Sequence, residues 1–311
     1  MDTLAVLGAT ATGKSQLALD LARHLAEHGV TVEIIGGDAM QRYRGLDIGT
    51  AKVPVEEREG VPHHEIDVLD PREESTVREY QASARAAADA IRARGNVPLY
   101  VGGSGLYLRA ALDELEIPPT DPDVRARLEL RLAAEGGEVL HAELARLDPA
   151  AAREIAPANA RRVVRALEVV ELTGRPFSAT RPTPHHHRPT LQLGLRVAGP
   201  ELDARIGARA DKMMREGLVE EARALERHGL SRTAARATGY PQALAVVHDE
   251  LDVAQATAQI AHATRKLARR QHTWFRPDPR TRWLDATGQD GATIEALWHG
   301  GLTQVLRALG A

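Results

Sequence analysis

The sequence predicts an α/β fold, in which a core with a parallel sheet is interrupted by an all-helical insertion. Short apolar runs alternate with helical patterns up to residue 115, only helical patterns occur over 121–173, and a strand pattern returns at 191. Proline-containing breaks separate these stretches. We therefore expect a core made of residues 1–117 and 191–311, with residues 118–190 as the insertion.

The first expected strand leads into a phosphate-binding sequence. Leu4 to Leu7 is a short apolar run, and residues 8–15 read GATATGKS, which fits G-x-x-x-x-G-K-[ST]. Helical spacing follows at once. A glycine loop between a strand and a helix N-terminus directs backbone N–H groups and the positive end of the helix dipole at an anion. The core is therefore predicted to be P-loop NTPase-like, with Lys14 reaching a terminal phosphate and the Ser15 hydroxyl holding Mg²⁺.

The second expected strand, 32–35, ends in Gly-Gly-Asp and places Asp38 at a carboxyl strand end, where open α/β sheets bind ligands. Residues 39–62 look irregular. The next helix is expected over 75–94, with Ser75 as its N-cap. The other expected strands are 97–101, 191–197 and 282–284, and the other expected helices are 106–115, 122–135, 137–147, 149–155, 159–173, 202–228, 241–248, 253–275 and one after 284.

Composition excludes several classes of protein. The 311 residues include no cysteine, which rules out disulfides, thiolate metal sites and cysteine nucleophiles. No apolar stretch is long enough to span a membrane, and the chain enters a strand too early for a signal peptide, so we expect a cytoplasmic protein without a membrane partner. The net charge of −3 argues against a globally basic nucleic-acid binder but leaves local basic patches open.

Some candidate residues have two interpretations. Asp38 either caps a loop or supports Mg²⁺, or it is a general base within hydrogen-bond reach of the proton that it takes. The arginines at 161, 162 and 165 either contact nucleic-acid phosphates or form a solvated face that pairs with Glu168. Residues 265–276 interleave basic and aromatic side chains, which suits either RNA contact or an amphipathic packed helix. His185 to His187, among prolines, are expected in an exposed linker.

Taken together, several segments resemble the bacterial tRNA dimethylallyltransferases. DAMQRY at 38–43 and LDIGTAK at 46–52 are similar to that family's D-S-x-Q-x-Y…D-I-G-T-A-K signature, and 8–15 is similar to its G-P-T-A-S-G-K-[ST]. Further similar stretches are GGSGLY at 102–107, RRVVRALEV at 161–169, GY at 239–240 and RQHTWFR at 270–276. The resemblance spans nearly the whole chain in order.

The resemblance implies that a dimethylallyl group moves from dimethylallyl diphosphate to N6 of the adenosine 3′-adjacent to the anticodon in tRNA, with release of diphosphate. It implies Mg²⁺ as cofactor, and an insertion at 118–190 that grips the anticodon arm of the tRNA. A monomer is expected. From the residues alone, two other functions stay open: a small-molecule or nucleotide kinase, and a non-catalytic RNA-binding protein with a regulatory P-loop.

The resemblance also implies roles for individual residues. Asp38 would accept the N6 proton, while Thr10 and Arg209 would stabilise the departing diphosphate. The expected diphosphate-binding residues are Gly8, Ala9, Thr10, Ala11, Thr12, Gly13, Lys14 and Ser15, with Ser15 also holding the metal. The expected tRNA-binding residues are Asp38, Ala39, Met40, Gln41, Ser104, Arg125, Arg161, Arg162, Arg165, Arg270 and Trp274. Ala9, Ala39, Ser104 and Pro241 stand where the family usually has Pro, Ser, Thr and a basic residue.

Overall fold

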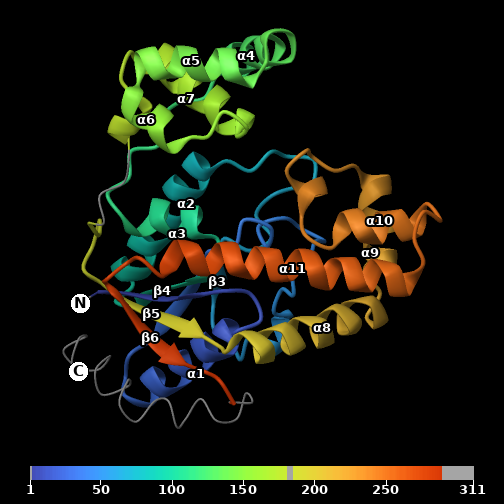
Figure 1. The fold of residues 1–311 in the computed structure, drawn as a ribbon. Helices are drawn as coiled ribbons and strands as arrows, with labels where there is room; N and C mark the ends of the chain where they lie inside the picture. The colour runs from blue at the N-terminus through green and yellow to red at the C-terminus, as the bar shows by residue number, and fades with distance from the viewer. Residues whose placement is uncertain (1, 181–184, 289–311) are drawn as a thin grey trace. The chain divides into compact units, whose positions relative to one another are not determined.

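The computed structural model describes residues 2–180 and 185–288 (Figure 1). The chain divides into two compact units, which we call the core unit (Met1–Leu112 with His186–Ala311) and the helical unit (Asp113–His185). The helical unit begins and ends slightly earlier along the chain than the predicted insertion, 118–190. None of the described helices combines the length and the apolar character that crossing a membrane requires.

The core unit is built on one six-stranded sheet, and every neighbouring pair of strands is parallel. The strand order is β3-β2-β4-β1-β5-β6, so the chain crosses over between non-adjacent strands. The predicted α/β fold with a parallel sheet is confirmed. The strands are β1 (Thr3–Gly8), β2 (Val32–Gly36), β3 (His63–His64), β4 (Val97–Gly102), β5 (Thr190–Arg196) and β6 (Thr281–Asp285).

Helices cover both faces of this sheet. Along β1 successive side chains alternate between faces. Leu4 and Val6 pack in a cluster with the apolar side of α1 (Lys14–Glu27). Ala5 and Leu7 pack in a second cluster with α2 (Val77–Ala93) and α3 (Gly105–Leu112). Burial on both faces explains why β1 is apolar from Leu4 to Leu7, as is typical of central parallel strands.

A third cluster of buried side chains joins the helices that follow β5, and Ile206, Leu218 and Tyr240 lie within it. These helices are α8 (Gly199–Arg215), α9 (Leu218–His228), α10 (Tyr240–Val247) and the long α11 (Val253–Phe275). Figure 1 shows α11 in red-orange running alongside α8, and residues of the two helices are in contact. Short 3-10 helices lie at Val55–Glu57 and Ala234–Arg236.

The helical unit has its own apolar core. Leu128, Leu140, Leu144 and Val163 are almost completely buried in it. Its elements are α4 (Pro122–Glu135), α5 (Gly137–Leu147), α6 (Pro149–Glu154), α7 (Ala160–Thr173) and a 3-10 helix at Phe177–Thr180.

Three sequence expectations about elements were wrong. The helix expected over 202–228 is two helices, because Gly217 has a φ of 102° that a continuing helix cannot adopt. The N-cap of α2 is Thr76, which forms a capping box with Glu79, and not Ser75. The helix expected over 106–115 already ends at Leu112. The helix expected after 284 falls mostly on 289–311, outside the described residues.

Candidate active site

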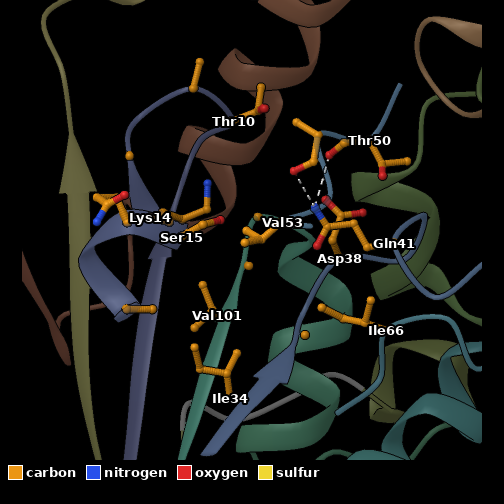
Figure 2. A pocket seen from close by; sticks show the side chains of 18 of the residues that line it. Thr10, Lys14, Ser15, Ile34, Asp38, Gln41, Thr50, Val53, Ile66 and Val101 are labelled. Atoms are coloured by element: carbon orange, nitrogen blue, oxygen red, sulfur yellow. Dashed lines mark hydrogen bonds between the residues drawn. The ribbon is translucent and has the colours of Figure 1, made fainter. Parts of the chain in front are cut away.

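A cavity of about 360 Å³ opens at the carboxyl ends of β1, β2 and β4 (Figure 2). In Figure 2, Lys14 and Ser15 lie on one side of it, Asp38, Gln41 and Thr50 on the other. Side chains from α8 and α11 also reach its wall, through Arg205, Arg209 and Gln271. The cavity therefore combines the phosphate loop with residues from distant parts of the core unit.

The loop between β1 and α1 adopts the geometry that phosphate binding needs. Gly8, Ala11 and Gly13 all have positive φ values, of 146°, 65° and 94°. At Gly8 a Cβ would lie 2.6 Å from the carbonyl oxygen of Leu195, so only glycine fits there. Gly13 is the N-cap of α1, and the helix begins at Lys14 on the cavity wall. The unpaired N–H groups of this first turn suit an anion.

Lys14 is a cation in direct contact with the loop. Its Nζ donates a hydrogen bond to the carbonyl oxygen of Ala9 at 2.5 Å. Burial, together with the nearby charge of Arg209, lowers the pKa of Lys14 to about 8, although Asp38 acts in the opposite direction. The ammonium group is therefore poorly solvated, and a bound phosphate would stabilise its positive charge.

Arg209 on α8 brings a second cation to the same cavity. Its Nη1 donates to the Thr10 Oγ1 at 3.0 Å, and its Nη2 donates to the carbonyl oxygen of Thr50 at 3.3 Å. Burial lowers the pKa of Arg209 from its usual value, and the carboxylate of Asp38 partly offsets this effect. The predicted catalytic residues Thr10, Arg209 and Asp38 thus line one cavity.

Asp38 follows the end of β2 and is half-buried at the cavity wall. Its Oδ1 accepts the backbone N–H of Met40 at 2.9 Å, which fixes the carboxylate relative to the loop after it. The next N–H, that of Ala39, donates to the Oγ of Ser104 at 3.3 Å. Ser104 therefore tethers the segment that carries Asp38, and Asp38 both closes a loop and faces the cavity.

Two residues that matter to this geometry had no assigned role from the sequence. Gln271 of α11 accepts the backbone N–H of Thr10 at 2.8 Å, and a Cβ on Gly103 would lie 2.5 Å from its Nε2. Thr50 supplies a carbonyl that Gln41 Nε2 also contacts, at 3.1 Å. The only available signal for Gln271 was its place in the RQHTWFR stretch.

The residues present fit a magnesium ion that is held mainly by the phosphates of a bound ligand. Over residues 2–180 and 185–288 there is no group of three acidic or histidine side chains with the spacing of a metal site. Ser15 lies in the first turn of α1, exposed at the cavity wall beside Lys14. Mg²⁺ commonly takes few protein ligands when substrate phosphates supply the rest.

In the core unit, the residues expected to bind tRNA differ in exposure: some are half-buried near the cavity, and others are exposed on α11. Ala39 and Met40 are half-buried and pack against the apolar clusters, while Gln41 reaches the cavity wall. Arg270 is exposed on α11. Trp274 is 46% exposed, and its side chain lies so close to Gly105 that a Cβ there would be 2.8 Å from it.

In the helical unit, the four arginines that were expected to bind tRNA differ in their surroundings. Arg125 and Arg165 both pair with the buried carboxylate of Glu168, at 2.5 and 2.8 Å. Arg165 also donates to the carbonyl oxygens of Pro118 and Pro119. Glu168 thus pairs with Arg165, as the structural interpretation of residues 161–165 expected, and also with Arg125, which that interpretation did not include. Arg161 and Arg162 reach solvent.

Comparison with known proteins gives a consistent family assignment. The tRNA dimethylallyltransferase of Thermobifida fusca is 54% identical over 92% of this chain and 91% of its own, and that of Mycobacterium tuberculosis is 53% identical over 92% and 93%.

Solved structures are similar over the same length. The full-length tRNA isopentenylpyrophosphate transferase of Bacillus halodurans has a TM-score of 0.68 and 35% identity over 100% of this chain and 99% of its own. A eukaryotic dimethylallyltransferase captured acting on tRNA has a TM-score of 0.79 and 26% identity, over 96% of this chain and 78% of its own. The family model for IPP transferase matches residues 41–278, and this chain therefore belongs to the IPP transferase family.

Proposed function

We propose that this protein transfers the dimethylallyl group of dimethylallyl diphosphate to N6 of the adenosine 3′-adjacent to the anticodon in tRNA, and releases diphosphate. The observation that carries the proposal is a single cavity shared by a phosphate-binding loop and a fixed carboxylate, Asp38. A phosphate loop alone would suit many reactions. Relatives more than 50% identical are named tRNA dimethylallyltransferase, and both features suit that reaction.

We assign stabilisation of the departing diphosphate to the loop and Arg209. As the bond between C1 of the dimethylallyl group and the diphosphate oxygen breaks, its electron pair passes to the diphosphate. The N–H groups at the start of α1, the Lys14 ammonium and the Arg209 guanidinium would stabilise the growing charge. Because Thr10 accepts its hydrogen bond from Arg209, its own hydroxyl proton remains to be donated to the diphosphate.

We assign activation of the nucleophile, the adenine N6, to Asp38. The adenine N6 is a weak nucleophile, so attack on C1 is favoured if the N6 proton leaves as the N–C bond forms. The Oδ1 of Asp38 accepts the N–H of Met40, which leaves its Oδ2 to take that proton. The target base has to leave its stack to reach the cavity.

The five-carbon group needs an apolar surface beside the phosphates. Ile34, Ile66 and Val101 line the same cavity, and in Figure 2 they lie below Asp38 and Lys14 in the view. A volume of about 360 Å³ is within the usual range for small-molecule pockets. Ser15 would hold Mg²⁺, which when bound neutralises phosphate charge.

The tRNA would be held largely through its phosphates. Arg161 and Arg162 in the helical unit and Arg270 in the core unit are exposed cations that suit such contacts. Arg125 and Arg165 are instead engaged by Glu168, so we assign them mainly to the shape of the helical unit.

The proposal is tested by incubating the purified protein with unmodified tRNA, Mg²⁺ and dimethylallyl diphosphate, and analysing the tRNA nucleosides by mass spectrometry. We expect N6-dimethylallyladenosine and one diphosphate released per modified nucleoside. A parallel reaction with ATP in place of the donor serves as the control. ATP turnover without nucleoside modification would contradict the proposal and favour a kinase.

A further inference from the structure

One backbone carbonyl orients two side chains of the cavity. We call residues 46–52 the signature loop. The carbonyl oxygen of Thr50 in this loop accepts Arg209 Nη2 at 3.3 Å and Gln41 Nε2 at 3.1 Å. Any shift of the signature loop would therefore change where both side chains point.

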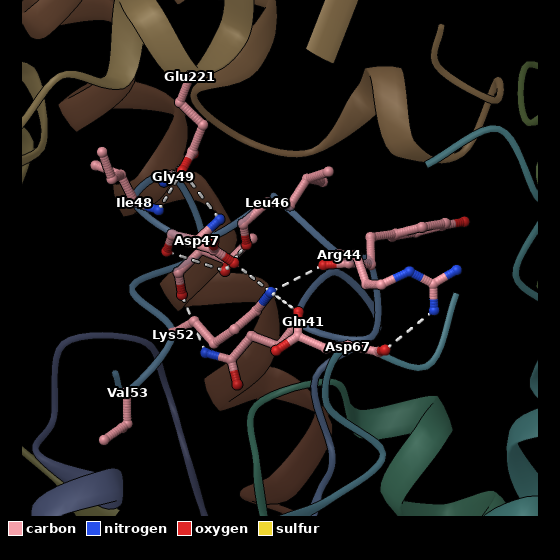
Figure 3. Close-up of polar contacts among 12 residues, drawn as sticks. Gln41, Arg44, Leu46, Asp47, Ile48, Gly49, Lys52, Val53, Asp67 and Glu221 are labelled. Atoms are coloured by element: carbon pink, nitrogen blue, oxygen red, sulfur yellow. Dashed lines mark hydrogen bonds and ion pairs between the residues drawn. The ribbon is translucent and has the colours of Figure 1, made fainter. Parts of the chain in front are cut away.

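The signature loop is held from outside the cavity by Glu221, which lies on α9 (Figure 3). The Oε2 of Glu221 accepts the backbone N–H groups of Asp47 and Ile48 at 3.2 and 2.9 Å, and its Oε1 accepts that of Gly49 at 3.1 Å. Three consecutive N–H groups thus converge on one carboxylate. Hydrogen bonds to an ionised group are stronger than neutral ones.

Tyr240, the first residue of α10, completes this anchor. Its hydroxyl donates to Glu221 Oε1 at 2.7 Å, and burial raises the pKa of Tyr240, so the phenol keeps the proton that it donates. Its ring packs on the backbone of Gly49, where a Cβ would lie 2.6 Å from ring atoms. The loop is therefore clamped between α9 and α10.

We propose that Glu221 is a positioning residue for the transfer reaction: it holds the signature loop so that the Thr50 carbonyl aims Arg209 at the diphosphate. Glu221 does not line the cavity that would hold the substrates. The inference rests on the proposed function for the identity of the donor. The competing anchor is Lys52, whose Nζ donates to the carbonyl of Tyr43 and to the carboxylates of Asp47 and Asp67. If Lys52 alone fixes the loop, Glu221 is dispensable.

The first test compares Glu221→Gln with Glu220→Gln. Glutamine nearly keeps the shape but has one accepting oxygen, so about half of the hydrogen bonds are lost. A small misplacement of a positioning group commonly costs up to about 10²-fold in rate, and we expect kcat to fall about 10- to 100-fold. The affinity for inorganic diphosphate, measured by calorimetry, should fall several-fold. Glu220, the exposed neighbour on α9, is the matched control and should leave both values unchanged.

The second test asks whether Glu221 acts through Arg209. In a double-mutant cycle, Glu221→Gln should cost much less in kcat in the Arg209→Ala background than in the wild type, because Arg209 is no longer there to be misdirected. A purely structural role would instead give the same fold-decrease in kcat in both backgrounds. That result, or a kcat of Glu221→Gln within twofold of the wild type, would overturn the inference.

Should Glu221→Gln not fold, Gly49→Ala takes its place in both tests, because its Cβ would push the signature loop off Tyr240 while Glu221 stays. Thermal unfolding of each variant identifies the folded ones. Diphosphate binding needs no tRNA and no transfer, so it separates the two hypotheses. If the wild type transfers no dimethylallyl group while Glu221 still controls diphosphate affinity through Arg209, the proposed function fails and the positioning role stands.

Discussion

Charged side chains at the cavity differ most in how firmly they are held. Asp38 is fixed by the N–H of Met40, and Arg209 by Thr10 and Thr50. Lys14 donates to the carbonyl of Ala9, which lies in the same loop that we expect to bind the anion. We therefore expect Asp38 to be preorganised for its task and Lys14 to change its partner when a diphosphate arrives.

Replacing Asp38 by asparagine should abolish most turnover and leave tRNA binding intact. The amide has nearly the same shape but cannot accept the N6 proton, and loss of a general base typically lowers the rate by about 10²–10⁴-fold. The measurements are kcat for nucleoside modification and the tRNA dissociation constant. Asp211→Asn, an exposed position on α8, is the control. Turnover within a few-fold of wild type would remove Asp38 from the role of base.

Donor binding should weaken as the pH rises through about 8. The pKa of Lys14 is lowered to about 8, so its ammonium is charged below that pH and loses its proton above it. The positive charge that pairs with the diphosphate is therefore present at pH 7 and largely absent at pH 9.5. Calorimetry with dimethylallyl diphosphate at both pH values checks this. Lys14→Ala should bind weakly at both, and an equal pH effect in this variant would assign the titration to another group.

At the scale of elements, apolar runs and helical spacing predicted five of the six strands and most helices; β1, β2 and β5 form apolar runs because they are buried on both faces. The break at Gly217 escaped because the helical pattern of apolar residues continues on both sides of it. The two-residue strand β3 has no apolar run to reveal it.

In the site, Lys14, Ser15 and Asp38 stand out in local motifs. Gln271 lies in the RQHTWFR stretch, but its role was not predicted, because its contact with Thr10 spans 261 positions and depends on how α11 packs.

Gly217→Ala should destabilise the core unit. Gly217 has a φ of 102° at the junction of α8 and α9, a conformation that costs an L-residue on the order of 1–2 kcal/mol. Gly199→Ala in the first turn of α8 is the control, since a Cβ there meets nothing within 4 Å. Chemical denaturation gives both free energies of unfolding. Equal values for the two variants would mean that the junction tolerates a side chain.

At the scale of the whole molecule, the core unit should fold without the helical unit. The N–H of His187 donates to the carbonyl of Leu112 at 2.8 Å, so the chain leaves and re-enters the core unit at adjacent points. We expect the protein with residues 113–185 replaced by a short Gly/Ser linker to unfold cooperatively and to bind dimethylallyl diphosphate with wild-type affinity. Loss of cooperative unfolding would contradict this.

The same variant should lose most of its tRNA affinity, because Arg161 and Arg162 are removed with the helical unit. Phosphate contacts make nucleic-acid binding salt-dependent, so the slope of affinity against salt concentration should become shallower in the variant. A titration of tRNA binding at several salt concentrations measures both. An unchanged slope would mean that the tRNA is held by exposed cations of the core unit, such as Arg270 on α11.

The chain leaves and re-enters the core unit at adjacent points, and this also affects the order of folding. Strand β5 has to find β1 across more than half of the chain, and closing a long loop costs entropy that grows with its length. The ends of the helical unit are themselves joined, since the N–H of Glu114 donates to the carbonyl of His185 at 2.9 Å. Once α4 to α7 have formed through local contacts, the effective loop between β4 and β5 shrinks to a short crossing. Early folding of the helical unit would thus speed assembly of the sheet that it does not belong to.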